Sequence, residues 1–140
     1  MDRKTRICIW IIVLGLVNFL AYTVVYVSLG GDAMNGAILR DGRSMLHYFL
    51  EANGQRMEVS RTVWLYSAVH SISIWLTVGA VLLSTLTLAK DHIVSQMHSS
   101  IVHGRTFMTI LATVVTLITV IITAFFVLKT LRNLTNPGGM

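Results

Sequence analysis

Three apolar stretches without a charged residue constrain this chain more than any other feature of its sequence. They cover residues 7–29, 62–89 and 106–128. At about 1.5 Å per residue, a helix over the first stretch is about 35 Å long, enough to cross a hydrocarbon core of roughly 30 Å. The sequence therefore predicts an all-α integral membrane protein in which residues 1–140 form a single domain with three transmembrane helices.

The composition supports this class of protein. Only 12% of the residues are charged, whereas a soluble domain averages about 25%. The net charge of +5 would also suit a nucleic-acid partner, but the sequence contains no run of four or more basic residues. Because the Lys and Arg residues gather near the ends of the apolar stretches, we expect a lipid bilayer as the partner and no nucleic acid. The single Cys8 excludes an internal disulfide.

The first apolar stretch is predicted to be a membrane span rather than a signal peptide. It follows the basic segment MDRKTR, but it is longer than the 7–15 residues typical of a signal-peptide core, and no A-x-A cleavage site follows it. Arg3, Lys4 and Arg6 precede this span and predict a cytoplasmic N-terminus by the positive-inside rule. The same topology places Lys129 and Arg132 outside, so the bias that sets the orientation is small.

The polar loop over residues 30–61 contains two kinds of turn signal. In GGDAMNGAILRDGR, glycine stands beside Asp or Asn, which predicts turns rather than a helix. In HYFLEANGQRMEVS, Asn53 and Gly54 separate two runs that suit short strands, and this dipeptide is a strong hairpin signal. We therefore predict a short β-hairpin in this loop, followed by Ser60 as the cap of the second helix.

The second loop, residues 90–105, carries a helical pattern. Ile93, Met97 and Ile101 recur at i, i+4 and i+8, which is the spacing of one helix face. The loop is therefore predicted to be a short connection into which the second helix extends.

Two of the predicted helices carry stripes of small and hydroxyl residues at alternating spacings of three and four. The stripes are His70, Ser73, Thr77, Ala80, Ser84 and Thr87 in the second helix, and Thr106, Thr109, Thr113, Thr116, Val120 and Thr123 in the third. Lipid tails give no hydrophobic reward for helix association, so small residues and interhelical hydrogen bonds must supply it. We favour an antiparallel pair packed through these stripes. In the alternative, each hydroxyl bonds to its own helix and faces lipid.

The polar residues of all three helices are predicted to meet near the middle of the bilayer. Measured along ideal helices from one membrane face, Asn18, His70 and Thr116 lie at about 16, 18 and 15 Å. Because an unpaired polar group in hydrocarbon is costly, we expect them to face one another, with a neutral His70 bonded to Asn18 or to a hydroxyl. The predicted helix-packing cluster consists of Asn18, Tyr22, His70, Ser73, Thr77, Thr113 and Thr116.

His70 is also a candidate ligand for a cofactor. An intramembrane imidazole with Ser67 and Ser71 beside it could serve as the axial ligand of a tetrapyrrole, either haem or a chlorophyll-type pigment. Only His47 lies on the same side as a possible second ligand. We favour a packing role, because no Asp, Glu, Lys or Arg lies within the spans to continue a proton or ion path, and we expect no bound cofactor. A small channel or transporter is the third alternative.

Two segments carry a family resemblance. GDAMNG after the first span and EVSRTVWLYSAVHSISIW at the start of the second resemble short uncharacterised bacterial inner-membrane proteins, over about residues 30–75. This resemblance implies a location in the bacterial inner membrane and implies no activity.

The sequence does not predict an enzyme. It contains no paired carboxylates, no nucleophile–base pair and no glycine-rich phosphate loop. His92, His98 and His103 are separated by six and five residues, which does not align metal ligands on one helix face. The preferred function is a non-catalytic small accessory subunit of a larger or homo-oligomeric membrane complex, packed through Ser/Thr-rich helix faces.

Overall fold

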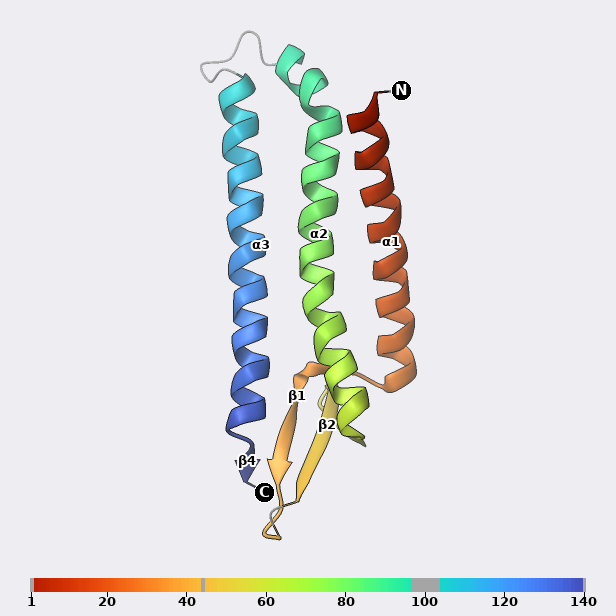
Figure 1. Ribbon diagram of the computed structural model, residues 1–140, viewed down its shortest axis with the longest axis vertical. Coiled ribbons are helices and arrows are strands. Elements are labelled where there is room, and N and C mark those ends of the chain that lie inside the picture. The colour runs from red at the N-terminus through yellow and green to blue at the C-terminus, as the bar shows by residue number, and fades with distance from the viewer. Residues whose placement is uncertain (1, 44, 97–103, 140) are drawn as a thin grey trace.

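The protein, described by a computed structural model over residues 2–43, 45–96 and 104–139, consists of three long helices with a small sheet at one end (Figure 1). The helices are α1 (Arg3–Leu29), α2 (Arg61–Gln96) and α3 (Gly104–Thr135). In these parts of the chain, all three are long and apolar enough to cross a membrane, which confirms the three predicted helices. Each continues beyond its apolar stretch into the flanking polar residues.

The three helices lie side by side, with α2 between α1 and α3 (Figure 1). Glycine permits the close approach on both sides of α2. A Cβ on Gly15 of α1 would lie 2.3 Å from Val81, and a Cβ on Gly79 of α2 would lie 2.4 Å from Thr119 of α3. Such glycines let helix backbones approach closely where hydrophobic burial gives no reward. The outward faces of α1 and α3 remain exposed and apolar.

The sheet contains β1 (Asp32–Arg40), β2 (Leu46–Ala52), β3 (Gln55–Val59) and the two-residue β4 (Gly138–Gly139), in the order β3-β2-β1-β4. Strands β2 and β3 are antiparallel neighbours joined by Asn53 and Gly54, whose φ angles are 52° and 78°. Two consecutive positive φ angles are what a tight hairpin turn requires. The predicted hairpin is therefore confirmed, and β1 extends it into a larger sheet.

Strand β1 corrects the prediction of turns in part: Gly30, Gly31 and Gly42 lie in turns or bends as predicted, but residues 32–40 between them form a strand. Its register with β2 jumps from Asp32↔Glu51 to Ala37↔Phe49, so four residues of β1 stand opposite one residue of β2. These four residues, 33–36, are called the β1 bulge below. A Cβ on Gly36 would lie 1.9 Å from the carbonyl oxygen of Phe49, so glycine is needed where the two backbones meet. Residues 32–40 form a strand because Gly36 takes part in a bulge instead of a turn.

The hydrophobic core lies where the sheet meets the helices. Its fully buried members are Ala33, Met34, Ile38, Leu50, Trp64 and Ala68. The first two turns of α2 therefore bury Trp64 and Ala68 in this core. The cap predicted for this helix is present, since Ser60 Oγ accepts a hydrogen bond from the Val63 N–H at 3.4 Å.

At its other end, α2 continues to Gln96, so the helix extends into the predicted second loop. Of the three residues that carried this prediction, Ile93 lies on α2, while Met97 and Ile101 lie outside the described residues.

The β1 bulge gives a test with a matched control. Gly36→Ala is expected to lower the free energy of unfolding by roughly 1–3 kcal/mol or more, because the new methyl group meets the Phe49 backbone. Gly42→Ala meets nothing within 4 Å and should leave stability unchanged or raise it by up to about 1 kcal/mol. Unfolding in mild detergent, followed by circular dichroism, measures both. Equal stability of the two variants would contradict the bulge.

Candidate functional site

One predicted polar contact between α1 and α2 is present in the structure. Asn18 Nδ2 donates a hydrogen bond to Thr77 Oγ1 at 3.0 Å. Thr77 Oγ1 in turn donates to the carbonyl of Ser73 at 2.7 Å, and Ser73 Oγ donates to the carbonyl of His70, also at 2.7 Å. Asn18, Ser73 and Thr77 therefore form a connected polar row along the α1–α2 interface.

A second polar group lies nearer to the sheet and is called the Tyr22 cluster. It consists of Tyr22, Asp32, Ser67, His70 and Ser71. Tyr22 Oη donates to Asp32 Oδ2 at 3.0 Å and lies 3.4 Å from Ser71 Oγ. Because the phenol has one proton and Asp32 receives it, Ser71 is the donor in the second contact.

Asp32 is the charged member of this cluster and is only 8% exposed. Its other oxygen, Oδ1, accepts a hydrogen bond from the backbone N–H of Asn35 at 2.9 Å. Within the described part of the chain, no Lys or Arg lies within ion-pair distance of this carboxylate. A buried carboxylate without a cation depends on its hydrogen bonds, so the bonds from Tyr22 and Asn35 are what make this position tolerable.

The β1 bulge and Asp32, the residue before it, are together bound to all three helices. The Ala33 N–H donates to Ser67 Oγ of α2 at 3.0 Å, and Lys129 Nζ of α3 donates to the carbonyl of Met34. Tyr22 of α1 holds Asp32, the residue before the bulge. Each helix thus contributes one side chain that bonds either to the backbone of the bulge or to the carboxylate of Asp32.

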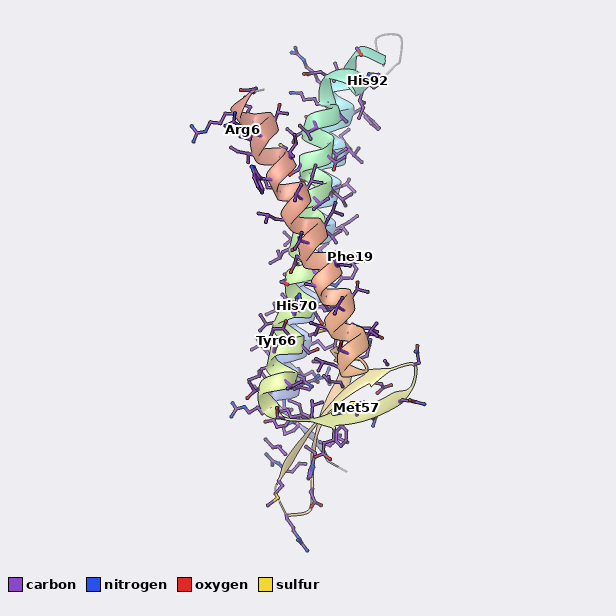
Figure 2. All side chains as sticks on the ribbon, turned by 90° about the vertical axis from the view of Figure 1, so that its right-hand side faces the viewer. Arg6, Phe19, Met57, Tyr66, His70 and His92 are labelled. Atoms are coloured by element: carbon purple, nitrogen blue, oxygen red, sulfur yellow. The ribbon has the colours of Figure 1, made fainter. Side chains whose placement is uncertain are left out.

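His70 lies in the cluster but is not bonded as predicted. Its ring packs edge-on against Tyr22, with centroids 5.3 Å apart, and against Tyr66 at 5.5 Å. Figure 2 shows Tyr66 and His70 on neighbouring turns of α2. Nδ1 is buried, and the described residues provide no hydrogen-bond partner for it. The expected bond to Asn18 is absent because Asn18 bonds to Thr77, two turns further along α2.

The surroundings of His70 do not fit a tetrapyrrole. A macrocycle held by the imidazole needs a flat slot beside the ring, but the aromatic rings of Tyr22 and Tyr66 occupy this space. The remaining crevice, lined by Val25 and Asp32 among others, is too narrow for a water molecule. His47, the considered second ligand, instead contacts Glu58 at 2.6 Å on the sheet. A haem or chlorophyll-type ring therefore does not fit between these helices.

Thr113 and Thr116 do not join either polar group. Both are exposed, and they donate to the carbonyls of Thr109 and Ala112 in their own helix at 2.8 Å. The face of α3 that packs on α2 carries Thr119 and Phe126 instead. The predicted interhelical hydrogen bonding of the stripes is therefore corrected at these two positions: the i−4 backbone bond satisfies each hydroxyl, and neither bonds to α2.

Two residues that hold the site together, Asp32 and Lys129, are not predicted from the sequence, and Ser67 is predicted only as a neighbour of His70. A signal existed for Asp32, because it is an acidic residue directly after an apolar helix and two glycines. For Lys129, the sequence predicts only a position at the end of the third span. Its bond to Met34 depends on the bulge, which the sequence pattern did not indicate.

Among the described residues, no group of three or more His, Cys, Asp or Glu side chains is placed to hold a metal ion. Comparison of the chain with protein-family models, curated proteins and solved structures finds no match. The contacts above are therefore the basis for any functional inference.

Removing the Tyr22 hydroxyl should loosen the sheet. Tyr22→Phe leaves the buried Asp32 with one donor fewer, so we expect the free energy of unfolding to fall by about 1–3 kcal/mol and the β1 amides to exchange faster. Tyr26→Phe on the next turn is the control and should change stability by less than about 0.5 kcal/mol. Hydrogen exchange in detergent distinguishes the two. If the β1 amides are equally protected from exchange in both variants, the Tyr22–Asp32 bond is not what holds the strand.

The Asn18–Thr77 bond should be measurable as a coupling energy. In a double-mutant cycle of Asn18→Leu and Thr77→Val, we expect about 0.6–2 kcal/mol of coupling, as for hydrogen bonds between membrane helices. The same cycle with Thr113→Val in place of Thr77→Val should give none, because Thr113 bonds to its own helix. Unfolding by SDS of the four proteins in each cycle supplies the coupling energies. A coupling of Asn18 to Thr113 as large as that to Thr77 would refute the Asn18–Thr77 bond.

Proposed function

We propose that this protein is a non-catalytic subunit of a bacterial inner-membrane complex, made with other subunits or with further copies of itself, and that it holds a small sheet in a fixed position at one membrane face. The length and apolar surfaces of α1, α2 and α3 support insertion as three spans. Arg3, Lys4 and Arg6 support a cytoplasmic N-terminus, which puts the sheet on the opposite face.

The attachment of Asp32 and the β1 bulge to all three helices is the observation that carries this proposal. A loop between two membrane spans usually moves independently of them. Here Tyr22, Ser67 and Lys129 each bond to Asp32 or to the bulge, and the core around Trp64 fills the junction. Hydrogen bonds from three separate helices fix both the position and the direction of the sheet, which is what a docking surface requires.

The same contacts argue against catalysis at this site. Asp32 is the only charged residue of the Tyr22 cluster, and both of its oxygens already accept hydrogen bonds. Because it is 8% exposed and the crevice beside it is too narrow for water, a substrate has no route to its carboxylate. The polar groups are used to hold the fold.

The free edge of β3 is the surface at which we expect a partner. Among the strands that the structure describes, β3 has a neighbour on one side only, and most of its residues are exposed. Its Met57 side chain is 51% exposed and lies on the sheet in Figure 2. An exposed edge offers unpaired N–H and C=O groups to a further strand. A rigid sheet with one open edge suits recognition by strand addition.

A single N–H group tests this mode of binding. In a two-residue hairpin, the pair next to the turn, Ala52↔Gln55, is hydrogen-bonded, and bonded and non-bonded pairs then alternate. The N–H of Glu58 therefore points to the free edge. Glu58→Pro removes this donor and leaves the ladder with β2, whereas Glu58→Ala keeps the donor and removes only the carboxylate.

We expect the wild-type protein, extracted in mild detergent, to have a mass well above one 15.5 kDa chain, either with another subunit or as an oligomer. Glu58→Pro should reduce this mass to a single chain, and Glu58→Ala should not. Light scattering on the purified protein, with identification of co-purifying chains, provides the measurement. A wild-type protein that remains a single chain without a partner would overturn the proposed function.

A further inference from the structure

The end of the helices away from the sheet contains an open groove between α2 and α3 with a volume of about 580 Å³. Lys90 and Arg105 lie at one end of this groove, since Lys90 is near the end of α2 and Arg105 is at the start of α3. Met108, Ala112 and Leu117 line it further along α3. The groove is thus cationic at its mouth and runs along apolar side chains toward the middle of the helices.

The threonines of the groove add little polarity to its walls. Thr87, Thr109, Thr113 and Thr116 line it, and each hydroxyl donates to a carbonyl of its own helix at 2.7–3.0 Å. With its proton used, a threonine offers a guest only its methyl group and a weak acceptor. The walls therefore suit a hydrocarbon chain, and the groove offers strong hydrogen-bond donors only at its mouth.

The two cations at the mouth have no carboxylate partner among the described residues. Arg3, Lys4 and Arg6 lie at the same end of the molecule, as the label of Arg6 in Figure 2 shows, whereas this end carries only two acidic residues, Asp2 and Asp91. A second copy in the same orientation would bring further cations to this end, and like charges repel. The charges therefore favour an anion over another copy of the chain.

The length of the groove matches one leaflet of a bilayer. From Arg105 to Leu117 the helix rises by about 18 Å, and half of a hydrocarbon core is roughly 15 Å thick. A molecule with an anionic head at Arg105 can therefore place an apolar tail along the whole groove.

We propose that this groove binds one anionic phospholipid, with its phosphate between Lys90 and Arg105 and one acyl chain against Met108, Ala112 and Leu117. The guanidinium of Arg105 can bind two phosphate oxygens at once, and Lys90 adds a point charge from the neighbouring helix. A zwitterionic headgroup brings its own cation to the mouth and loses much of this attraction. Basic pockets between transmembrane helices are the kind of site at which anionic headgroups bind.

Native mass spectrometry of the full-length protein in a non-ionic detergent tests the headgroup. Phosphatidylglycerol and phosphatidylcholine with identical acyl chains are added in competition. We expect the wild type to prefer phosphatidylglycerol roughly 30-fold, because each cation near the surface contributes a factor of about five. Lys90→Gln/Arg105→Gln should abolish the preference. Lys4→Gln/Arg6→Gln removes an equal number of positive charges from the same end of the molecule, outside the groove, and should preserve the preference for phosphatidylglycerol.

A second pair of variants tests the acyl chain without changing charge. Ala112→Phe fills the groove and should reduce retention of bound lipid at least fivefold, whereas Ala124→Phe on an exposed face of α3 should not. Circular dichroism confirms that each variant is helical. Three results would overturn the proposal: equal binding of the two lipids by the wild type, equal loss in both double variants, or a change of oligomeric mass in Ala112→Phe with unchanged lipid binding. None of these results depends on the β3 edge.

Discussion

The hydrogen bonds to the buried carboxylate of Asp32 are the interaction on which the arrangement of sheet and helices depends. Taking a charge out of water is expensive, and within the described ranges the Tyr22 hydroxyl and the Asn35 N–H are the donors that compensate Asp32. Both donors are available only when the β1 bulge is formed and α1 lies against it. The same geometry delivers the Ala33 N–H to Ser67. Bulge, sheet position and helix packing therefore stabilise one another.

The parts of the fold that the sequence predicts are those determined by local pattern. Uncharged stretches identify the three helices, and Asn53-Gly54 identifies the hairpin because only such residues readily adopt two positive φ angles in succession. Strand β1 could not be recognised in this way. Glycine beside Asp is compatible with a turn and with a bulge, and only the Phe49 carbonyl on the opposite strand makes Gly36 necessary.

The candidate site was predicted in part, and the errors have a geometric cause. The predicted depths in the membrane start at the first apolar residue of each stretch. In α2, however, the first two turns lie beside the sheet, where they bury Trp64 and Ala68 in the core. This shift places Asn18 opposite Thr77 and brings His70 level with Tyr22. For α3, which is apolar on all sides, the hydrophobic pattern does not indicate which face contacts α2.

The capacity of a polar side chain to satisfy itself locally explains which of these residues connect elements and which do not. A threonine in a helix can donate to the i−4 carbonyl, as Thr113 does, and then needs no partner elsewhere. Asn18 and Asp32 have more hydrogen-bonding atoms than their own elements can satisfy. Asn18 therefore bonds to Thr77 of α2, and Asp32 bonds to Tyr22 of α1. Thr109, Thr113 and Thr116 of α3 consequently line the groove beside α2 as an almost apolar wall, without a hydrogen bond to that helix. The few residues that cannot be satisfied within their own helix determine how the helices and the sheet are joined.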